Sequence, residues 1–212
     1  MNKINYQKEL DKITDALEGR RPRLLLHVCC APCSSYCIEY LSAFFDITLF
    51  FYNPNIDGAP EHDKRAGELA RLRDEMECKK VFDPGSVSCM ILPFTPEDFE
   101  AIASGLEDVP EGGARCRKCY ALRMEKAAEY AAKESYDYFT TTLSISPLKN
   151  ADWINEIGQE LSERYGVKHL PSDFKKRNGY KRSVELSGIY GLYRQNYCGC
   201  SYSKRGKDEH TT

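Results

Sequence analysis

Short, continuous apolar runs alternate with longer amphipathic segments along this chain of 212 residues. The run at residues 24–28 is typical of a strand buried on both faces, as in a parallel sheet. An alternation of such strands with helices predicts an α/β fold with a mostly parallel sheet flanked by helices. We expect strands within residues 24–28, 46–56, 79–94 and 136–147, and helices within 3–19, 31–44, 61–80, 96–108, 111–135 and 152–166.

The sequence predicts one α/β domain over residues 1–212. The basic portion, residues 164–207, holds eleven Lys and Arg against two Asp and Glu, although the whole chain has a net charge of −2. Seven aromatic residues lie in the same portion. Cations mixed with rings suit a single-stranded nucleic acid, whose phosphates bind cations and whose bases stack on rings. A solvated basic face with half-buried tyrosines is the alternative.

Within the basic portion, five cations are crowded close together, and we expect them to contact phosphates. They are Lys175, Lys176, Arg177, Lys181 and Arg182.

Ten cysteines distinguish the chain from an ordinary globular protein. No apolar run approaches the roughly 18 residues that span a bilayer, and the charged N-terminus lacks the apolar core of a secretion signal. We therefore expect a cytoplasmic protein. In a reducing compartment, many cysteines indicate metal ligands or redox-active thiols rather than structural disulfides.

Four of the cysteines form two pairs at predicted loop positions. Cys29 and Cys30 follow the first strand, where a parallel sheet places its ligands, and Cys116 and Cys119 form a C-x-x-C at the start of a helix. Four thiolates suffice for a tetrahedral zinc or for an iron–sulfur cluster. The long separation of the pairs favours the cluster, while zinc and a set of buried free thiols stay open.

A third pair, Cys198 and Cys200, flanks Gly199. The glycine permits the tight backbone of a small disulfide ring, which would be strained and easily reduced. The pair is therefore a candidate two-electron store, and two further metal ligands are the alternative. Cys78 and Cys89 stand alone, and we interpret them as incidental or structural.

Two further observations limit the chemistry. The chain contains neither G-x-x-x-x-G-K-[ST] nor G-x-G-x-x-G, so these forms of nucleotide phosphate loop are absent from it. His27 lies inside the first apolar run and is interpreted as a buried core histidine rather than a ligand.

Six motifs together resemble the QueH-type epoxyqueuosine reductases, in the right order over nearly the whole chain. They are LHVCCAPCS (26–34), FFYNPNI (50–56), GGARCRKCYALRM (112–124), YFTTTLSISPLKN (138–150), SDFKKRNGYKRS (172–183) and LYRQNYCGCSYS (192–203). The resemblance implies a Rossmann-like fold of the PP-loop, adenine-nucleotide-hydrolase type. It also implies an oxidoreductase that reduces epoxyqueuosine to queuosine in tRNA, the last step of queuosine biosynthesis.

The same resemblance assigns roles to individual cysteines. It implies that Cys29, Cys30, Cys116 and Cys119 hold a [4Fe–4S] cluster, and that the C-x-C pair, Cys198 and Cys200, forms a redox-active disulfide. In some members a mononuclear iron lies beside the cluster, and Cys33 is its candidate ligand here, at a position where part of the family has a carboxylate. The implied partners are an anticodon loop of tRNA and an electron donor that the sequence does not identify.

Overall fold

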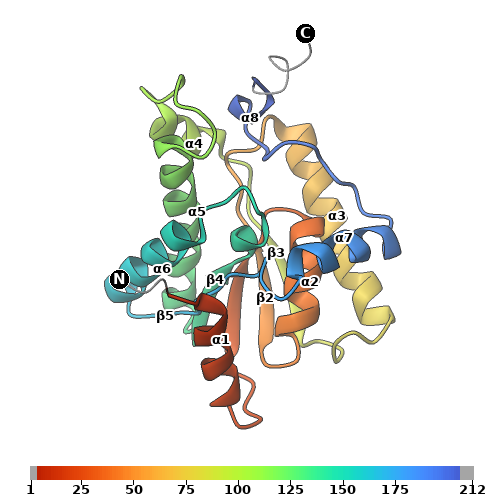
Figure 1. Cartoon of the computed structure of the whole chain (residues 1–212). Helices are drawn as coiled ribbons and strands as arrows, with labels where there is room; N and C mark the ends of the chain where they lie inside the picture. The colour runs from red at the N-terminus through yellow and green to blue at the C-terminus, as the bar shows by residue number, and fades with distance from the viewer. Residues whose placement is uncertain (1–3, 206–212) are drawn as a thin grey trace.

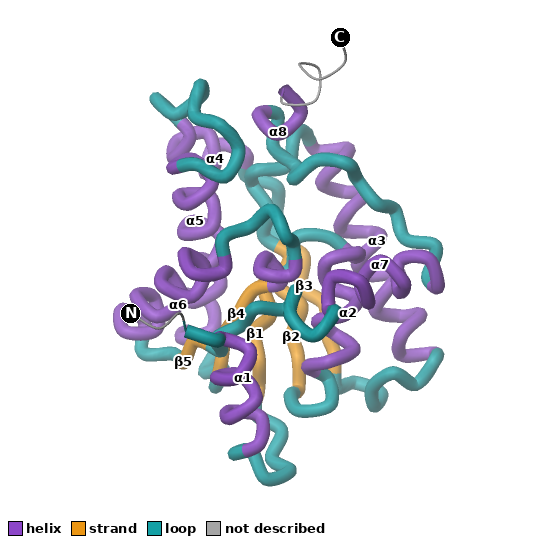
Figure 2. Tube along the Cα trace, viewed as in Figure 1, coloured by secondary structure: helices purple, strands orange, loops and turns teal. Residues whose placement is uncertain are grey.

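A five-stranded parallel sheet forms the centre of the computed structural model, which describes residues 4–205 (Figure 2). The strand order is β3-β2-β1-β4-β5, and every neighbouring pair is parallel. The prediction of a mostly parallel α/β fold is confirmed. The strands are β1 (Arg23–His27), β2 (Asp46–Phe51), β3 (Val87–Ile91), β4 (Tyr138–Thr141) and β5 (Lys168–His169).

Helices cover both faces of the sheet (Figure 1). On one face α1, α2, α3 and α7 contribute to a core that includes Leu24 and Leu26 of β1. On the other face α5 and α6 pack against Leu25. The helices are α1 (Tyr6–Asp15), α2 (Ala31–Leu41), α3 (Ala59–Cys78), α4 (Pro96–Ala103), α5 (Ala114–Lys133), the 3₁₀ segment η1 (Thr142–Ile145), α6 (Ala151–Tyr165), α7 (Gly179–Ile189) and α8 (Tyr202–Arg205).

The central strand β1 is buried on both faces, because helices cover each side of it. Leu24, Leu25 and Leu26 are each fully buried, which explains why the run is continuously apolar rather than alternating. β1 pairs with β2 on one side and with β4 on the other. The chain order reverses between β1 and β4, and such a switch point opens a crevice beyond the carboxyl ends of the strands.

Three helices and one strand differ most from the predictions. Helix α4 ends at Ala103, five residues before the end of the predicted segment 96–108, and β5 lies where no strand is predicted. The first helix ends at Asp15, and a turn with positive φ values at Glu18 (50°) and Gly19 (83°) leads to β1. Helix α7 lies in a region that the sequence predicts to be rich in loops. It buries Ser183 and Ser187 beside Leu186, so its buried face carries little of the apolar periodicity that indicates a helix. Residues 206–207 of the basic portion lie outside the described residues.

Among residues 4–205, no helix combines the length and the apolar character that a membrane crossing requires.

The close approach of α6 to β5 yields a prediction about two glycines. A Cβ on Gly158 of α6 would lie 2.3 Å from the His169 ring, whereas a Cβ on Gly188 of α7 would meet nothing within 4 Å. Gly158→Ala should lower the free energy of unfolding by about 1–3 kcal/mol through overpacking. Gly188→Ala should raise it by about 0.5–1 kcal/mol through helix propensity. Urea unfolding measures the free energy of unfolding of both variants. If both substitutions changed it by the same amount in the same direction, this packing would be contradicted.

Candidate active site

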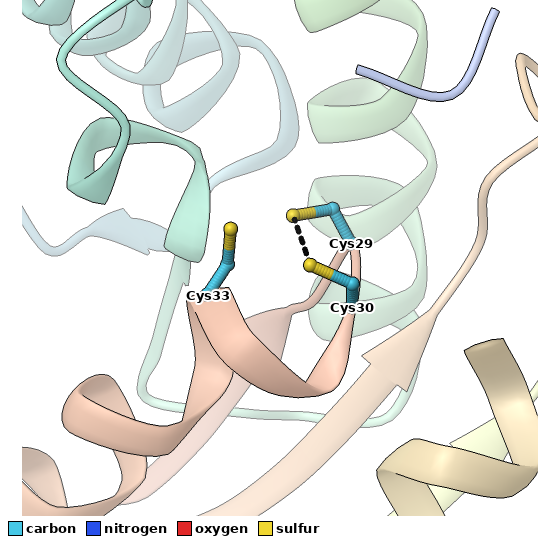
Figure 3. A group of neighbouring side chains, drawn as sticks. All are labelled: Cys29, Cys30 and Cys33. Carbon is cyan, nitrogen blue, oxygen red and sulfur yellow. Dashed lines mark hydrogen bonds between the residues drawn. The ribbon is translucent and has the colours of Figure 1, made fainter. Parts of the chain in front are cut away.

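The first thiol group lies where β1 ends and the chain turns into α2. Cys29 follows the strand, Cys30 is the N-cap of α2 in extended conformation, and Cys33 lies in the first turn of the helix. The three Sγ atoms lie within 4.8 Å of one another, and those of Cys29 and Cys30 are 3.9 Å apart. Figure 3 shows the three sulfurs pointing into one region beyond the strand end. The turn thus converts neighbours in sequence into a convergent set of ligands.

The electrostatics of the first group favour one thiolate, on Cys29. Hydrogen bonds from the Cys30 and Cys33 thiols, and then the charges of Arg123 and Lys149, hold the pKa of Cys29 well below its ordinary value. The contact with Cys29, together with burial, raises the pKa of the Cys30 thiol and that of the Cys33 thiol, so both stay protonated. A thiolate is the form of cysteine that binds metals, so the group is prepared for a metal.

The second thiol group combines the start of α5 with the C-x-C pair. Cys116 and Cys119 line a small cavity of about 20 Å³ together with Cys198 and Cys200. The Gly112 N–H donates to Cys116 Sγ at 3.2 Å. Burial raises the pKa of the Cys116 thiol, and it raises that of Cys119 to about 11. These two thiols therefore stay neutral until a metal binds or another cation approaches.

The two groups meet at Cys198. This residue also lines a larger cavity of about 400 Å³, whose wall includes Cys29, Cys30 and Cys33. The Lys149 ammonium lines the same cavity and donates to Cys198 Sγ at 3.1 Å.

Arg123 of α5 is a further cation between the groups. It lines the larger cavity, lies 4.0 Å from Cys119 Sγ and donates to Asn53 Oδ1 at 2.6 Å. Within residues 4–205, no carboxylate lies within salt-bridge distance of Arg123 or of Lys149. Burial lowers the pKa of Lys149, but the electrostatic interactions of its ammonium with Cys198, Tyr120 and Cys29 outweigh burial, and the net pKa is raised. Both side chains are therefore cations that face sulfur.

The predicted cluster ligands are divided between the two groups. Cys29 and Cys30 lie with Cys33, the predicted ligand of a second metal, while Cys116 and Cys119 lie with the C-x-C pair. The remaining cysteines line neither cavity. Cys37 is buried in α2, Cys78 is exposed at the end of α3, and Cys89 lies in β3.

The C-x-C pair is held in a fixed position along α3. Both of its thiols are free in this structure. Gly199 has φ +132°, and a Cβ there would lie 3.0 Å from Arg65 Nη1. Arg65 Nη1 donates to the Cys198 carbonyl at 3.3 Å, and the Asp57 N–H donates to the Gly199 carbonyl at 2.8 Å. The glycine is thus required both by the backbone conformation and by the buried guanidinium beside it.

Most aromatic rings of the basic portion have partners inside the protein. Phe174 is fully buried, and Tyr165 donates to Glu125 at 3.0 Å. Tyr180 differs, since it is 41% exposed and lines the larger cavity. The other four tyrosines contact cations: Tyr190 contacts Lys79, Tyr193 contacts Lys64, Tyr197 contacts Arg65 and Lys204, and Tyr202 contacts Arg115.

The five predicted phosphate contacts are of two kinds. Lys176 and Lys181 are exposed and form no ion pair with any residue that the structure describes. The others have carboxylate partners: Lys175 pairs with Asp173 at 2.6 Å, Arg177 with Asp11, and Arg182 with Glu39 at 2.7 Å.

His27 is a core residue, as the sequence predicts. Its ring nitrogens contact Thr141 Oγ1 at 2.8 Å and the Tyr52 carbonyl at 3.1 Å. Burial, and then the Arg123 charge, lower its pKa to about 3. Sequence reasoning missed Arg123 and Lys149. Arg123 lies four residues after Cys119, so helical spacing alone places both on one face of α5.

Residues 24–206 match the family model described as epoxyqueuosine reductase QueH. An epoxyqueuosine reductase QueH of Streptococcus pyogenes serotype M1 is 42% identical, over 96% of this chain and 79% of that protein. The same enzyme of Staphylococcus epidermidis is 43% identical, over 97% of this chain and 88% of that protein.

Among solved structures, the U34-tRNA thiolase NcsA of Methanococcus maripaludis, determined with its [4Fe–4S] cluster, has a similar fold. The TM-score is 0.51 at 12% identity, over 93% of this chain and 68% of that one. At this identity the likeness concerns the fold alone.

Proposed function

Because the chain belongs to the QueH family of epoxyqueuosine reductases, we propose that the two thiol groups beyond the sheet carry its reaction. The chain is an oxidoreductase that removes the epoxide oxygen of epoxyqueuosine in tRNA and leaves queuosine. This change takes two electrons and two protons and releases water. The observation that carries the proposal is the meeting of both thiol groups at Cys198, in the wall of a cavity of about 400 Å³.

Cys29, Cys30, Cys116 and Cys119 hold one [4Fe–4S] cluster in this proposal. Four thiolates are the ligands that such clusters take. Support comes from two cations without carboxylate partners among the described residues. Arg123 faces Cys119 Sγ, and Lys149 faces the adjacent Cys198 Sγ, so both would complement the negative charge of a thiolate-bound cluster. The U34-tRNA thiolase of similar fold carries a [4Fe–4S] cluster. When bound, the cluster supplies electrons one at a time.

Cys33 is the ligand that we propose for an additional mononuclear iron. Its sulfur lies within 4.8 Å of those of Cys29 and Cys30 and faces the larger cavity. A metal at this position would meet a substrate that enters the cavity, and a bound metal can polarise an oxygen as a Lewis acid.

Cys198 and Cys200 are the proposed redox pair. A dithiol holds two electrons, which matches the reaction. Only Cys198 of the two lines the larger cavity, while Cys200 is 9% exposed and packs beside Phe99. The pair thus has one sulfur toward the substrate and one toward the protein interior.

The tRNA binds over the start of α7 in this proposal. Tyr180 lies at the cavity and Lys181 is exposed beside it, so a ring and a cation are offered together to a single-stranded loop. Lys175, Lys176, Arg177 and Arg182 extend the same basic surface along the flanking segment. The three that have carboxylate partners would exchange a carboxylate for a phosphate.

The cluster assignment predicts which cysteine variants retain bound iron. The double variant Cys116→Ser, Cys119→Ser should lose most of its bound iron and its absorbance near 400 nm, because only two ligands remain. Cys33→Ser should retain the cluster and lose only the additional iron. Cys78→Ser and Cys89→Ser are matched controls outside both cavities. Iron and sulfide analysis after anaerobic purification measures all four, and a full iron load in the double variant would refute the assignment.

The redox assignment predicts a change in thiol labelling during turnover. After one turnover without external reductant, two thiols should be protected from alkylation, and mass spectrometry should locate them at Cys198 and Cys200. Cys78, which is exposed, should stay alkylated and serves as the internal control. If both thiols of the pair can still be alkylated after turnover, and Cys198→Ser loses a metal ion, the pair ligates a metal instead.

The tRNA interface predicts a salt dependence. Replacing Lys176 and Lys181 by alanine should weaken tRNA binding, because two cations that are free to meet phosphates are lost. The slope of log affinity against log salt should fall by roughly 0.7 for each contact to a single strand. Lys133→Ala is the matched control, since Lys133 is exposed at the end of α5 opposite to its cysteines. An unchanged slope in the double variant would argue against this surface.

A further inference from the structure

Lys149 lies beside the sulfurs of the candidate active site, but no step of the reaction described so far uses it. It follows the η1 segment, in the loop beyond β4 at the switch point. Its side chain is half-buried, and its ammonium donates to Cys198 Sγ at 3.1 Å. The neighbouring Leu148 is 76% exposed. The chain therefore passes close to the surface here and sends one cation inward to the sulfurs.

Lys149 lies in the lining of two cavities, as do its neighbours Pro147 and Leu148. One is the cavity of about 400 Å³ that Cys29, Cys30 and Cys33 line. The other is an outer cavity of about 560 Å³, and Lys149 is in its lining as well. A group that lies between a reaction cavity and an open groove can give a proton to the first and regain one from the water of the second.

The reaction consumes two protons, and such a group can supply one of them. Both carbon–oxygen bonds of the epoxide break, two electrons enter to form the carbon–carbon double bond, and two protons join the oxygen to form water. An oxygen that leaves as an alkoxide approaches the basicity of hydroxide, which is a strong base. A positioned donor that protonates this oxygen as the bond breaks contributes typically 10²–10⁴-fold in rate.

The other polar groups that line the cavity of about 400 Å³ are less suited to this proton transfer. Arg123 and Arg194 line it, but a guanidinium does not give up its proton in proteins. Glu111 and Tyr180 are exposed, and Tyr197 packs against two cations, Arg65 and Lys204. The Cys30 and Cys33 thiols also line this cavity, but the proposed function uses them as metal ligands. Compared with the arginines, Glu111 and the two tyrosines, Lys149 combines a transferable proton with a hydrogen bond to a sulfur of the site.

We propose that Lys149 is the proton donor to the oxygen that leaves the epoxide. Its Nζ–H bond breaks, the proton joins the oxygen, and the neutral amine recovers a proton from water in the outer cavity. The second proton of the product water also comes from solvent, and the reductant of the established reaction supplies both electrons. The inference rests on the epoxyqueuosine reductase activity, but it requires neither the disulfide cycle nor a particular set of cluster ligands.

Three substitutions separate proton donation from a merely electrostatic role. Lys149→Met removes both charge and proton, and its single-turnover rate should fall about 10²–10⁴-fold. Lys149→Arg keeps a cation beside Cys198 but cannot transfer its proton, so its rate should also fall. Lys149→Ala should regain rate with methylammonium and not with tetramethylammonium, which carries charge without a proton. Lys133→Met is the control for loss of a lysine outside the site.

Iron content, the visible spectrum and tRNA affinity are measured on every variant, and rates are expressed per loaded site. In Lys149→Arg these values should match the wild type, because that variant keeps a cation beside the sulfurs. Lys149→Met and Lys149→Ala lose this charge, so their rates are compared only per loaded site. A wild-type rate in either Lys149→Met or Lys149→Arg overturns the inference, as does equal rescue by the two ammonium ions. Iron-loaded wild-type protein that leaves epoxyqueuosine unchanged would instead overturn the proposed function, so the two failures are distinguishable.

Discussion

The pairing of β1 with both β2 and β4 is the constraint on which the rest of the site depends. Because all three strands are parallel, their carboxyl ends meet at one edge of the sheet. The helices leave this edge in opposite directions, α2 to one face and α5 with α6 to the other (Figure 1). The crevice between them receives the cysteine turn from β1 and the loop with Lys149 from β4. Thiols distant in sequence thereby reach a common volume.

Charge then determines what this crevice can hold. Arg123 and Lys149 face sulfurs, and no carboxylate that the structure describes lies within salt-bridge distance of them. Burial of an unpaired cation is costly, so these side chains are best explained by a negatively charged sulfur centre between them. The same cations would favour negative charge developing on an oxygen in the cavity. An environment that would stabilise a thiolate-bound cofactor would thus also favour the reaction.

The sequence predicted the parallel sheet and the place of the first cysteines because buried strands and strand ends have clear local signals. It did not predict α7, because the buried face of this helix includes serines. It also did not predict roles for Arg123 and Lys149, which approach the sulfurs only when α5 and the loop after β4 meet beside β1. The basic portion was interpreted as a surface for base stacking. In the structure four of its tyrosines contact cations instead, and Tyr180 is the ring that lines the cavity and is exposed. Pairing between distant segments has no local signal, so composition does not show which of these rings have partners inside the protein.

The most direct test of the central claim is the metal and sulfide content of the protein purified without oxygen. A reductase built on this sulfur site should contain about four irons and four sulfides per cluster, with any additional iron beyond the sulfide count and with little zinc. The protein should be brown. One zinc for each chain, with no acid-labile sulfide and no visible absorbance, would contradict the account, because a tetrahedral zinc site supplies no electrons.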